Sequence, residues 1–210
     1  TLSLHDALPI SDLKGRKIVY LTFDDGPSRN ITPQVLDILK EHDIKATFFI
    51  IGNLVEGNED IVNRIADEGH TIANHSYTHN YKALYASTDA FMAEIEKTDK
   101  VLKEVIGDRY QPKYVRFPGG GFGSEFDEMK TTLLENGYSY IQWNAATDDA
   151  VEKKPSVEKL FGNFKRTLNG SNYSVVLMHD SMAQKFTPQT LRLTIEYLKK
   201  EGYEFGTFKY

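Results

Sequence analysis

The sequence predicts an α/β protein with a parallel sheet whose strands are connected by helices. Strand-type and helix-type segments alternate about six times along the chain, which is typical of this class. Polar residues of catalytic type also gather where the predicted strands end, and in a parallel barrel that edge carries the active site. The sheet can be open or closed into a barrel. A chain of 210 residues is long enough for one domain with a full hydrophobic core.

The first half of the chain supplies three predicted strands and three predicted helices. β-branched, aromatic and uninterrupted apolar segments predict strands at residues 17–22, 46–51 and 70–74. Apolar residues at helical spacing predict helices at residues 33–41, 59–68 and 87–106. Thr32 is the expected N-cap of the first helix, because Pro33 suits the first helical position. Gly69 and Gly107 fit as the ends of the other two helices.

The second half continues the same alternation. The predicted strands are residues 113–117, 138–143, 173–178 and 203–208. The predicted helices are residues 127–135, 156–168 and 188–200. Ser156 is the expected N-cap of the helix at 156–168.

Composition excludes several classes of function. The net charge is −5 and no cluster of basic residues stands out, which argues against a nucleic-acid partner. No run of about 18 apolar residues occurs, so no segment is predicted to span a membrane. The absence of cysteine excludes disulfides, thiolate metal ligands and a cysteine nucleophile.

The first ten residues can be encoded by a nucleotide string that resembles a common sequencing-library adapter. We therefore interpret residues 1–10 as a non-native segment and residues 11–210 as the domain. We expect the native N-terminus, with any signal peptide or anchor, to be missing from this sequence. His5 and Asp6 are accordingly not counted as metal ligands.

Two adjacent carboxylates, Asp24 and Asp25, end the first predicted strand, and the turn residues Gly26 and Pro27 follow them. Neighbouring strand residues point to opposite faces, so the two should do different work unless the backbone bends. Two carboxylates in a partly buried site repel each other and require a metal, an arginine or a shared proton. A solvated Asp-Asp-Gly turn is the plain alternative.

His75 and His79 stand four residues apart, a spacing that on a helical turn places two imidazoles on one face for metal binding. Surface or capping histidines are the alternative. With Asp25 they form a set of two histidines and one carboxylate, which leaves positions for water and substrate. Zinc is the default ion, and other divalent first-row ions also suit such a site.

Two further segments add charge to the same edge. Arg116 ends a predicted strand and can hold a carboxylate ionised, and the glycines that follow Pro118 let backbone N–H groups approach a ligand. His179 ends another buried strand and is a candidate acid at neutral pH. A surface arginine in a glycine turn and a structural histidine are the alternatives.

Four motifs resemble those of the NodB-homology polysaccharide deacetylases, carbohydrate esterase family 4. They are Thr22-Phe23-Asp24-Asp25-Gly26-Pro27, His75-Ser76-Tyr77-Thr78-His79, Arg116-Phe117-Pro118-Gly119 and Leu177-Met178-His179-Asp180, in the order and rough spacing of the family. The resemblance covers about residues 15–210. It implies an α/β fold in the form of a distorted (β/α) barrel of about seven parallel strands. It also implies metal-dependent removal of acetyl groups from N-acetylated glycans or acetylated xylan.

The resemblance also implies roles by position. Asp24 matches the general base, Arg116 the residue that tethers it, and His179 the general acid. The metal ligands it implies are Asp25, His75 and His79. The fourth motif departs from the family, because Ala146 and Ala150 replace an Asp and a Trp. Asp149 then takes the position that tunes the acid histidine, with Asp148 as a rival one residue away.

The predicted substrate-binding residues are Phe117, Pro118, Gly119, Trp143 and Leu177. Gly119 stands where the family uses a backbone N–H for the oxyanion, often that of a tyrosine, and Leu177 matches a wall of the acetyl pocket. Tyr77, Tyr81 and Tyr85 are further aromatic candidates for a sugar-binding groove, but only Trp143 is given a place in the site. The altered fourth motif leaves the shape of the acetyl pocket open.

The resemblance implies a hydrolase that removes the N-acetyl group of N-acetylglucosamine residues in a glycan, with peptidoglycan as the first choice. Chitin oligosaccharides and acetylxylan are alternative substrates, and a catalytically silent glycan-binding domain is the alternative of another class. A phosphoester hydrolase is less favoured, because such sites more often use two metals and more carboxylates. The expected cofactor is one divalent ion, zinc first, with cobalt or manganese also suitable. Such an enzyme would act outside the cell or at the cell wall.

Overall fold

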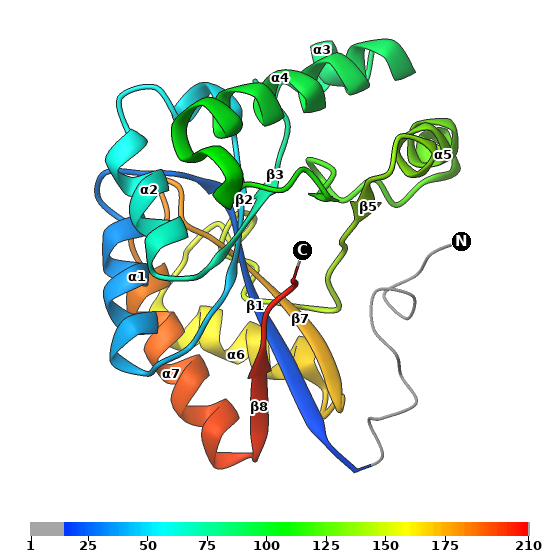
Figure 1. Cartoon of the computed structure of the whole chain (residues 1–210). Helices are drawn as coiled ribbons and strands as arrows, with labels where there is room; N and C mark the ends of the chain where they lie inside the picture. Colours follow the sequence, from blue (N-terminus) through cyan, green and yellow to red (C-terminus); the bar gives the residue numbers. More distant parts are fainter. Residues whose placement is uncertain (1–14, 210) are drawn as a thin grey trace.

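The computed structural model describes residues 15–209 and is built around one parallel sheet (Figure 1). Its strands are β1 (Lys17–Gly26), β2 (Thr47–Ile50), β3 (Thr71–Asn74), β4 (Tyr114–Val115), β5 (Ser139–Tyr140), β6 (Ala145–Ala146), β7 (Tyr173–His179) and β8 (Tyr203–Gly206). Seven strands follow the path β5-β4-β3-β2-β1-β7-β6, and β8 pairs with the first half of β1. All of these pairings are parallel. The predicted distorted barrel of about seven parallel strands is confirmed.

The two ends of the sheet path, β5 and β6, are joined by residues 141–144. Ile141 N donates to Val115 O of β4 at 2.9 Å, and Asn144 N donates to Val175 O of β7 at 3.2 Å. This connection therefore crosses the opening of the curled sheet. The single strand predicted at 138–143 is wrong for this reason, since the chain leaves β4 and passes to β7 within a few residues.

Helices surround the outer face of the sheet (Figure 1). They are α1 (Thr32–Glu41), α2 (Glu59–Asp67), α3 (Tyr81–Leu84), α4 (Thr88–Ile106), α5 (Asp127–Glu135), α6 (Val157–Leu168) and α7 (Thr187–Lys200). The longer helices pack in the order α6, α7, α1, α2, α4, α5. Short 3-10 turns occur at Gly52–Leu54, Gly107–Arg109 and Ser124–Phe126. The four-residue α3 was not predicted, because it is too short for a periodic pattern.

The helix ends follow the predictions at most positions. Ser156 Oγ accepts a hydrogen bond from Lys159 N at 3.3 Å, as expected for an N-cap. Thr32 is not an N-cap, because it lies inside α1 and its hydroxyl donates to Asp180 Oδ2 instead. Among residues 15–209, no helix combines the length and the apolar composition that a membrane crossing requires.

Side chains of β1 alternate between the two faces of the sheet, and this alternation determines which of them lie inside the barrel. Val19, Leu21 and Phe23 belong to the large core between the sheet and the helices. Ile18 and Tyr20 belong instead to a smaller cluster, where Tyr20 stacks on Phe208 at 4.8 Å. Because side chains alternate along a strand, Thr22 and Asp24 continue this second face. The smaller cluster lies toward the amino end of β1, and polar side chains follow it toward the carboxyl end.

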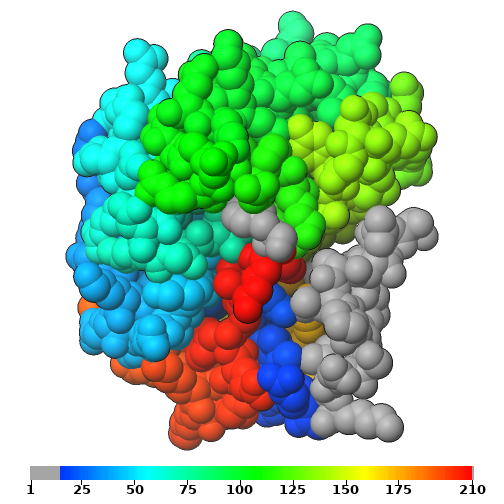
Figure 2. All heavy atoms as spheres, viewed as in Figure 1, coloured from blue at the N-terminus to red at the C-terminus, as the bar shows by residue number. Residues whose placement is uncertain are grey.

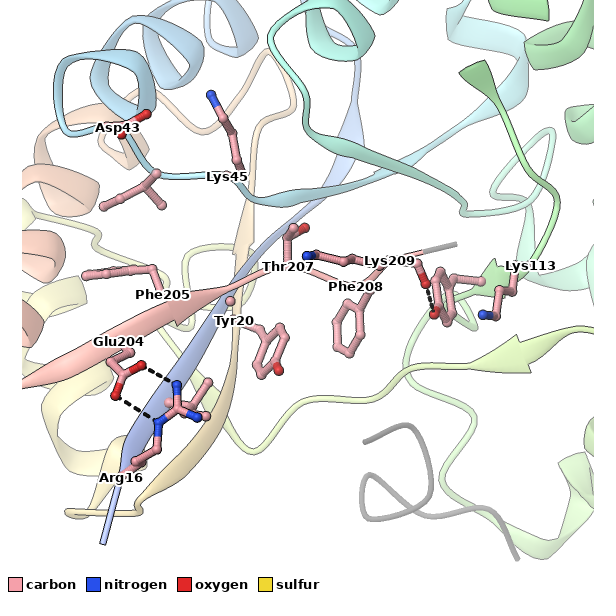
Figure 3. A pocket seen from close by; sticks show the side chains of 14 residues that line it. Arg16, Tyr20, Asp43, Lys45, Lys113, Glu204, Phe205, Thr207, Phe208 and Lys209 are labelled. Carbon is pink, nitrogen blue, oxygen red and sulfur yellow. Dashed lines mark hydrogen bonds and ion pairs between the residues drawn. The ribbon is translucent and has the colours of Figure 1, made fainter. Parts of the chain in front are cut away.

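A cleft of about 620 Å³ lies on the side of the sheet where β1, β2 and β4 begin (Figure 3). The ion pair between Arg16 and Glu204 lies at its edge, and Phe208 is among its lining residues. Figure 2 shows the C-terminal segment at the surface between the first strand and the segment that leads to β4. Since the predicted site residues follow the carboxyl ends of the strands, this cleft is separate from them.

Candidate metal centre and acid–base site

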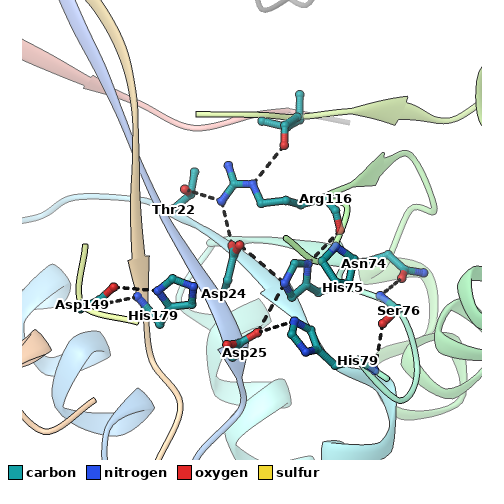
Figure 4. A network of polar contacts seen from close by, with 12 residues as sticks. Thr22, Asp24, Asp25, Asn74, His75, Ser76, His79, Arg116, Asp149 and His179 are labelled. Atoms are coloured by element: carbon teal, nitrogen blue, oxygen red, sulfur yellow. Dashed lines mark hydrogen bonds and ion pairs between the residues drawn. The ribbon is translucent and has the colours of Figure 1, made fainter. Parts of the chain in front are cut away.

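The end of β1 bends so that both carboxylates of the Asp24-Asp25 pair serve one site. Asp24 pairs with Phe49 of β2 and Gly26 with Ile50, so the register skips Asp25. Asp25 has a φ of 70°, in the left-handed region that is uncommon for residues other than glycine. The bend turns Asp25 toward the histidines while Asp24 stays on the inner face (Figure 4).

The bend requires glycine at position 26, because the Asp180 side chain lies too close to the backbone there for a Cβ atom. A Cβ atom at this position would lie 2.5 Å from Asp180 Oδ2. The Asp180 carboxyl is fully buried and accepts a hydrogen bond from Thr32 Oγ1 at 2.6 Å, and its backbone N donates to Asp24 O at 3.0 Å. Burial, together with the nearby charges of Asp25 and Asp24, raises the pKa of Asp180 to about 7. Asp180 was not assigned a role from the sequence, and it joins the end of β7 to the end of β1.

Asp25, His75 and His79 form a cluster whose possible ligand atoms all lie within 4.8 Å of one another (Figure 4). His75 Nε2 and His79 Nε2 lie 3.4 Å and 3.3 Å from Asp25 Oδ1. This oxygen is buried and has no hydrogen-bond partner within the described residues. A divalent ion fits this arrangement, because two imidazoles and a carboxylate are ligands that zinc and related ions prefer. The oxygen then gains the partner that its burial requires.

The electrostatics of the cluster favour an ionised ligand. Burial opposes ionisation of Asp25, but His75, His179 and His79 outweigh this effect and place the pKa of Asp25 well below its usual range. Burial also lowers the pKa of His79, so its neutral, metal-binding form is favoured. His75 Nδ1 lies 2.8 Å from Arg116 O. A hydrogen bond donated to that carbonyl leaves Nε2 free for a metal.

The spacing of the two histidines suggested a helical turn, but the structure has no helix at this position. Residues 75–79 form a loop in which Ser76 and His79 have φ values of 68° and 55°. His79 N donates to Ser76 Oγ at 3.1 Å, and Ser76 N donates to Asn74 Oδ1 at 2.9 Å. These local bonds stabilise a backbone shape that a helix would not provide.

Two acidic residues of α4 hold this loop from behind. Glu94 Oε2 accepts hydrogen bonds from Tyr77 N at 3.0 Å and from Thr78 N at 2.7 Å. Asp99 Oδ1 accepts from Asn74 Nδ2 at 2.7 Å. Sequence reasoning missed both residues, because acidic side chains on a helix carry no local signal of a loop contact elsewhere in the fold.

Asp24 is paired with Arg116 in the interior. Arg116 is fully buried, and its Nη1 donates to Asp24 Oδ1 at 2.7 Å and to Thr22 Oγ1 at 2.8 Å. Its Nε donates to Ile141 O at 3.0 Å, and the guanidinium lies 4.1 Å above the Phe49 ring. The arginine therefore fixes the position of the Asp24 carboxylate and compensates its charge. The other oxygen of Asp24 lies 3.7 Å from His75 Nε2, beside the metal cluster.

His179 is paired with Asp149, and the structure separates Asp149 from its rival. His179 Nδ1 lies 2.7 Å from Asp149 Oδ1, and His179 N donates to Asp149 Oδ2 at 2.8 Å. Asp148 instead accepts a hydrogen bond from Arg166 at 2.9 Å on the surface. Burial opposes the charged imidazole, but Asp149, with help from Asp24 and Asp25, raises the pKa of His179 to about 9. His179 is thus protonated at neutral pH.

The predicted substrate-binding residues differ in how far they are exposed and in whether their side chains face the site. Gly119 is exposed, and its N–H forms no hydrogen bond among the described residues, whereas Trp143 is half-buried 5.5 Å from the Arg116 guanidinium. Leu177 is a buried residue of β7. Phe117 does not reach the site, because its ring stacks on Phe91 in the core at 4.6 Å.

Pro118 also contributes little side-chain surface to the site. It is buried, and its carbonyl accepts a hydrogen bond from Tyr85 Oη at 2.6 Å. Its contribution is to the shape of the backbone that presents Gly119.

Comparison with known proteins agrees with this geometry. A family profile described as "Polysaccharide deacetylase" matches residues 12–141. The chain belongs to the polysaccharide deacetylase family. This confirms the resemblance drawn from the four motifs.

This chain is similar to bacterial members of that family. It is 37% identical over 195 residues to the peptidoglycan-N-acetylglucosamine deacetylase PgdA of Listeria monocytogenes, with 92% of this chain and 38% of that protein covered. The chain thus spans little more than a third of that relative. Among solved structures, a Streptococcus mutans CE4 esterase has a TM-score of 0.87 at 31% identity, with 94% of this chain and 88% of that chain covered.

A second solved relative is the catalytic domain of a peptidoglycan N-acetylglucosamine deacetylase from Eubacterium rectale. Its TM-score is 0.84 at 32% identity, with 93% of this chain and 90% of that chain covered.

Proposed function

We propose that this domain hydrolyses the N-acetyl group of N-acetylglucosamine residues in peptidoglycan. The reaction uses one divalent metal ion, for which zinc is the first choice. The observation that carries the proposal is the placement of two charged pairs beside one cluster of metal ligands. Asp24 is held by Arg116, and His179 by Asp149, and both pairs adjoin Asp25 and its histidines. The bacterial relatives named as peptidoglycan deacetylases support the substrate class. Action at the cell wall follows from that substrate.

The proposed metal ligands are Asp25, His75 and His79. A divalent ion held by these residues would supply Lewis acidity for polarising the acetamide carbonyl and for making water more acidic.

Asp24 is the proposed general base. Arg116 donates to its Oδ1, which leaves Oδ2 facing the ligand cluster. Oδ2 is therefore the oxygen placed to take a proton from the attacking water. Because Arg116 is fully buried and cannot move into solvent, the pairing keeps the carboxylate charged and oriented.

His179 is the proposed general acid. Asp149 occupies its Nδ1, so Nε2 is the nitrogen that carries a transferable proton. As water adds to the carbonyl carbon and the C–N bond breaks, this proton passes to the leaving nitrogen. The products are acetate and a free amine on the sugar. The raised pKa of His179 keeps the proton available over the neutral range.

Gly119 is the proposed backbone donor for the carbonyl oxygen. Its N–H has no hydrogen bond within the described residues, and the absence of a side chain lets a ligand approach closely. One such donor to a developing oxyanion is worth about 3 kcal/mol in the transition state.

Acetate release from peptidoglycan, chitooligosaccharides and acetylxylan tests the proposal. Each assay is run after chelation and again after zinc, cobalt or manganese is added back. We expect metal-restored release, with peptidoglycan preferred. Asp24→Asn should abolish release while the protein still binds metal. If metal binding is lost in this variant, the roles of Asp24 and Asp25 are exchanged. Failure of the metal-loaded wild type to release acetate from all three substrates would refute the proposed function.

A further inference from the structure

Tyr81 is an exposed residue whose ring contacts the metal-ligand cluster at His79. It begins α3, directly after the loop that carries His79, and the residue is 51% exposed. Its ring centroid lies 5.3 Å from that of His79, with the planes tilted by 47°. No role in the acid–base chemistry uses this side chain.

The hydroxyl end of Tyr81 borders the backbone of Gly119. A Cβ atom built on Gly119 would lie 3.4 Å from Tyr81 Oη and 3.5 Å from Tyr81 Cζ, which is contact distance. Gly119 itself has a φ of 73°, so a larger residue would be strained there. The tyrosine from α3 therefore borders the space into which a Cβ atom at position 119 would point.

The position of α3 is fixed from both ends. Asn80 caps the helix by accepting hydrogen bonds from Lys82 N and Ala83 N. At the other end, Tyr85 Oη donates to Pro118 O, the residue before Gly119. The Tyr81 ring is thus held against the glycine loop on one side and open on the other. The Tyr81 hydroxyl has no hydrogen-bond partner among residues 15–209. An aromatic ring of this kind is a suitable surface for a sugar ring, because it offers an apolar face and a polar end.

Most of the large exposed hydrophobic residues lie on loops at this same edge of the barrel. Besides Leu193 on α7, all the large exposed hydrophobic residues among residues 15–209 lie in segments that follow strands. They are Leu54 after β2, Tyr81 after β3, Phe122 after β4, Val151 after β6 and Met182 after β7. Tyr81 is the residue of this set that also contacts a predicted metal ligand, His79.

We propose that Tyr81 is a substrate-binding residue, which packs its ring against a pyranose ring of the glycan and donates a hydrogen bond from Oη to it. This inference rests on the proposed function and adds a subsite beside the metal centre. Because Tyr81 is outside the acid–base pairs, its loss should weaken substrate binding and leave the chemistry and the metal site intact. KM is therefore expected to change more than kcat.

Steady-state acetate release from N-acetylchitooligosaccharides of defined length, by the zinc-loaded domain, tests the subsite. We expect Tyr81→Ala to raise KM about tenfold with kcat nearly unchanged, and Tyr81→Phe, which loses only the hydrogen bond, to raise KM about threefold. Leu193→Ala removes another exposed apolar side chain, which lies on α7 and is 36% exposed, and should match the wild type. Zinc affinity, measured by calorimetry on each variant, should not change.

Several outcomes would overturn the proposal. An active wild type with an unchanged KM in Tyr81→Ala refutes the subsite and leaves the deacetylase function standing. Weaker zinc binding or a loss of kcat alone in Tyr81→Ala shows that the ring merely supports His79. A Tyr81→Phe variant equal to the wild type refutes the hydrogen bond. If the wild type releases no acetate, the proposed function fails, and the subsite fails with it.

Discussion

The buried pair of Asp24 and Arg116 makes a quantitative prediction about folding stability. Arg116→Met removes a fully buried guanidinium and leaves Asp24, which is 2% exposed, without its charged partner. Removal of one partner from a buried ion pair costs about 3–5 kcal/mol, because the remaining charge stays in a poorly solvated site. Since a domain is stable by about 5–15 kcal/mol, this change should remove a large share of the free energy of unfolding.

A double-mutant cycle separates the stranded charge from the loss of packing. Asp24→Asn in the Arg116→Met background replaces the unpaired carboxylate by a neutral amide of the same shape. We therefore expect the double variant to be more stable than Arg116→Met alone by at least about 1 kcal/mol.

Urea unfolding of the chelator-treated protein, followed by circular dichroism, measures each stability without a contribution from bound metal. Arg29→Met is the matched control, because Arg29 pairs with Asp60 on the exposed surface. Its loss should cost no more than about 1 kcal/mol. If the effects of Asp24→Asn and Arg116→Met simply add, the two residues are not energetically coupled and the reasoning is wrong.

Three further predictions address the acid, the metal loop and a buried histidine. Asp149→Asn should lower the pKa of His179 from about 9, so the fall of kcat at alkaline pH should begin at least about one pH unit lower, whereas Asp148→Asn should leave the profile unchanged. Glu94→Gln weakens the bonds to the loop at 75–79 and should reduce metal affinity about 10-fold to 100-fold in calorimetry, and the exposed Glu96→Gln on the same helix should not. His70 is buried, and burial lowers its pKa from 6.5 to about 4, so the folded state disfavours its protonation. Stability from His70 is therefore present above pH 6.5 and is lost as the pH falls toward 4, by up to about 3 kcal/mol, and His70→Gln should show that much less acid destabilisation in urea unfolding. Equal acid sensitivity in both proteins would contradict this assignment.

The sequence alone determined the elements whose signals are local. The apolar run of β7 and the amphipathic pattern of α4 predict their elements because each pattern extends over several residues. The four motifs likewise predict that Asp24, Asp25, the histidines, Arg116 and His179 belong to one site, since they follow successive parallel strands. The structure places these side chains together, and their catalytic roles remain predictions.

Tertiary contacts decided what the local patterns left open. The spacing of His75 and His79 suggested a helical turn, but Glu94 on another element holds these residues in a loop with left-handed residues. Phe117 was expected beside the substrate because of its place in a motif, but Phe91 draws its ring into the core. In both cases the deciding partner lies far away in the sequence.

The choice between Asp148 and Asp149 shows the same division. The sequence predicted an acidic partner for His179, because Asp149 and its rival Asp148 both lie in the segment aligned with the fourth motif. Only the folded chain selects Asp149, since β6 pairs with β7 and brings this carboxylate to His179, while Asp148 meets Arg166 of α6 at the surface. Local composition thus determined which chemistry gathers at the barrel edge. Strand pairing and packing between distant segments determined which atoms face one another there.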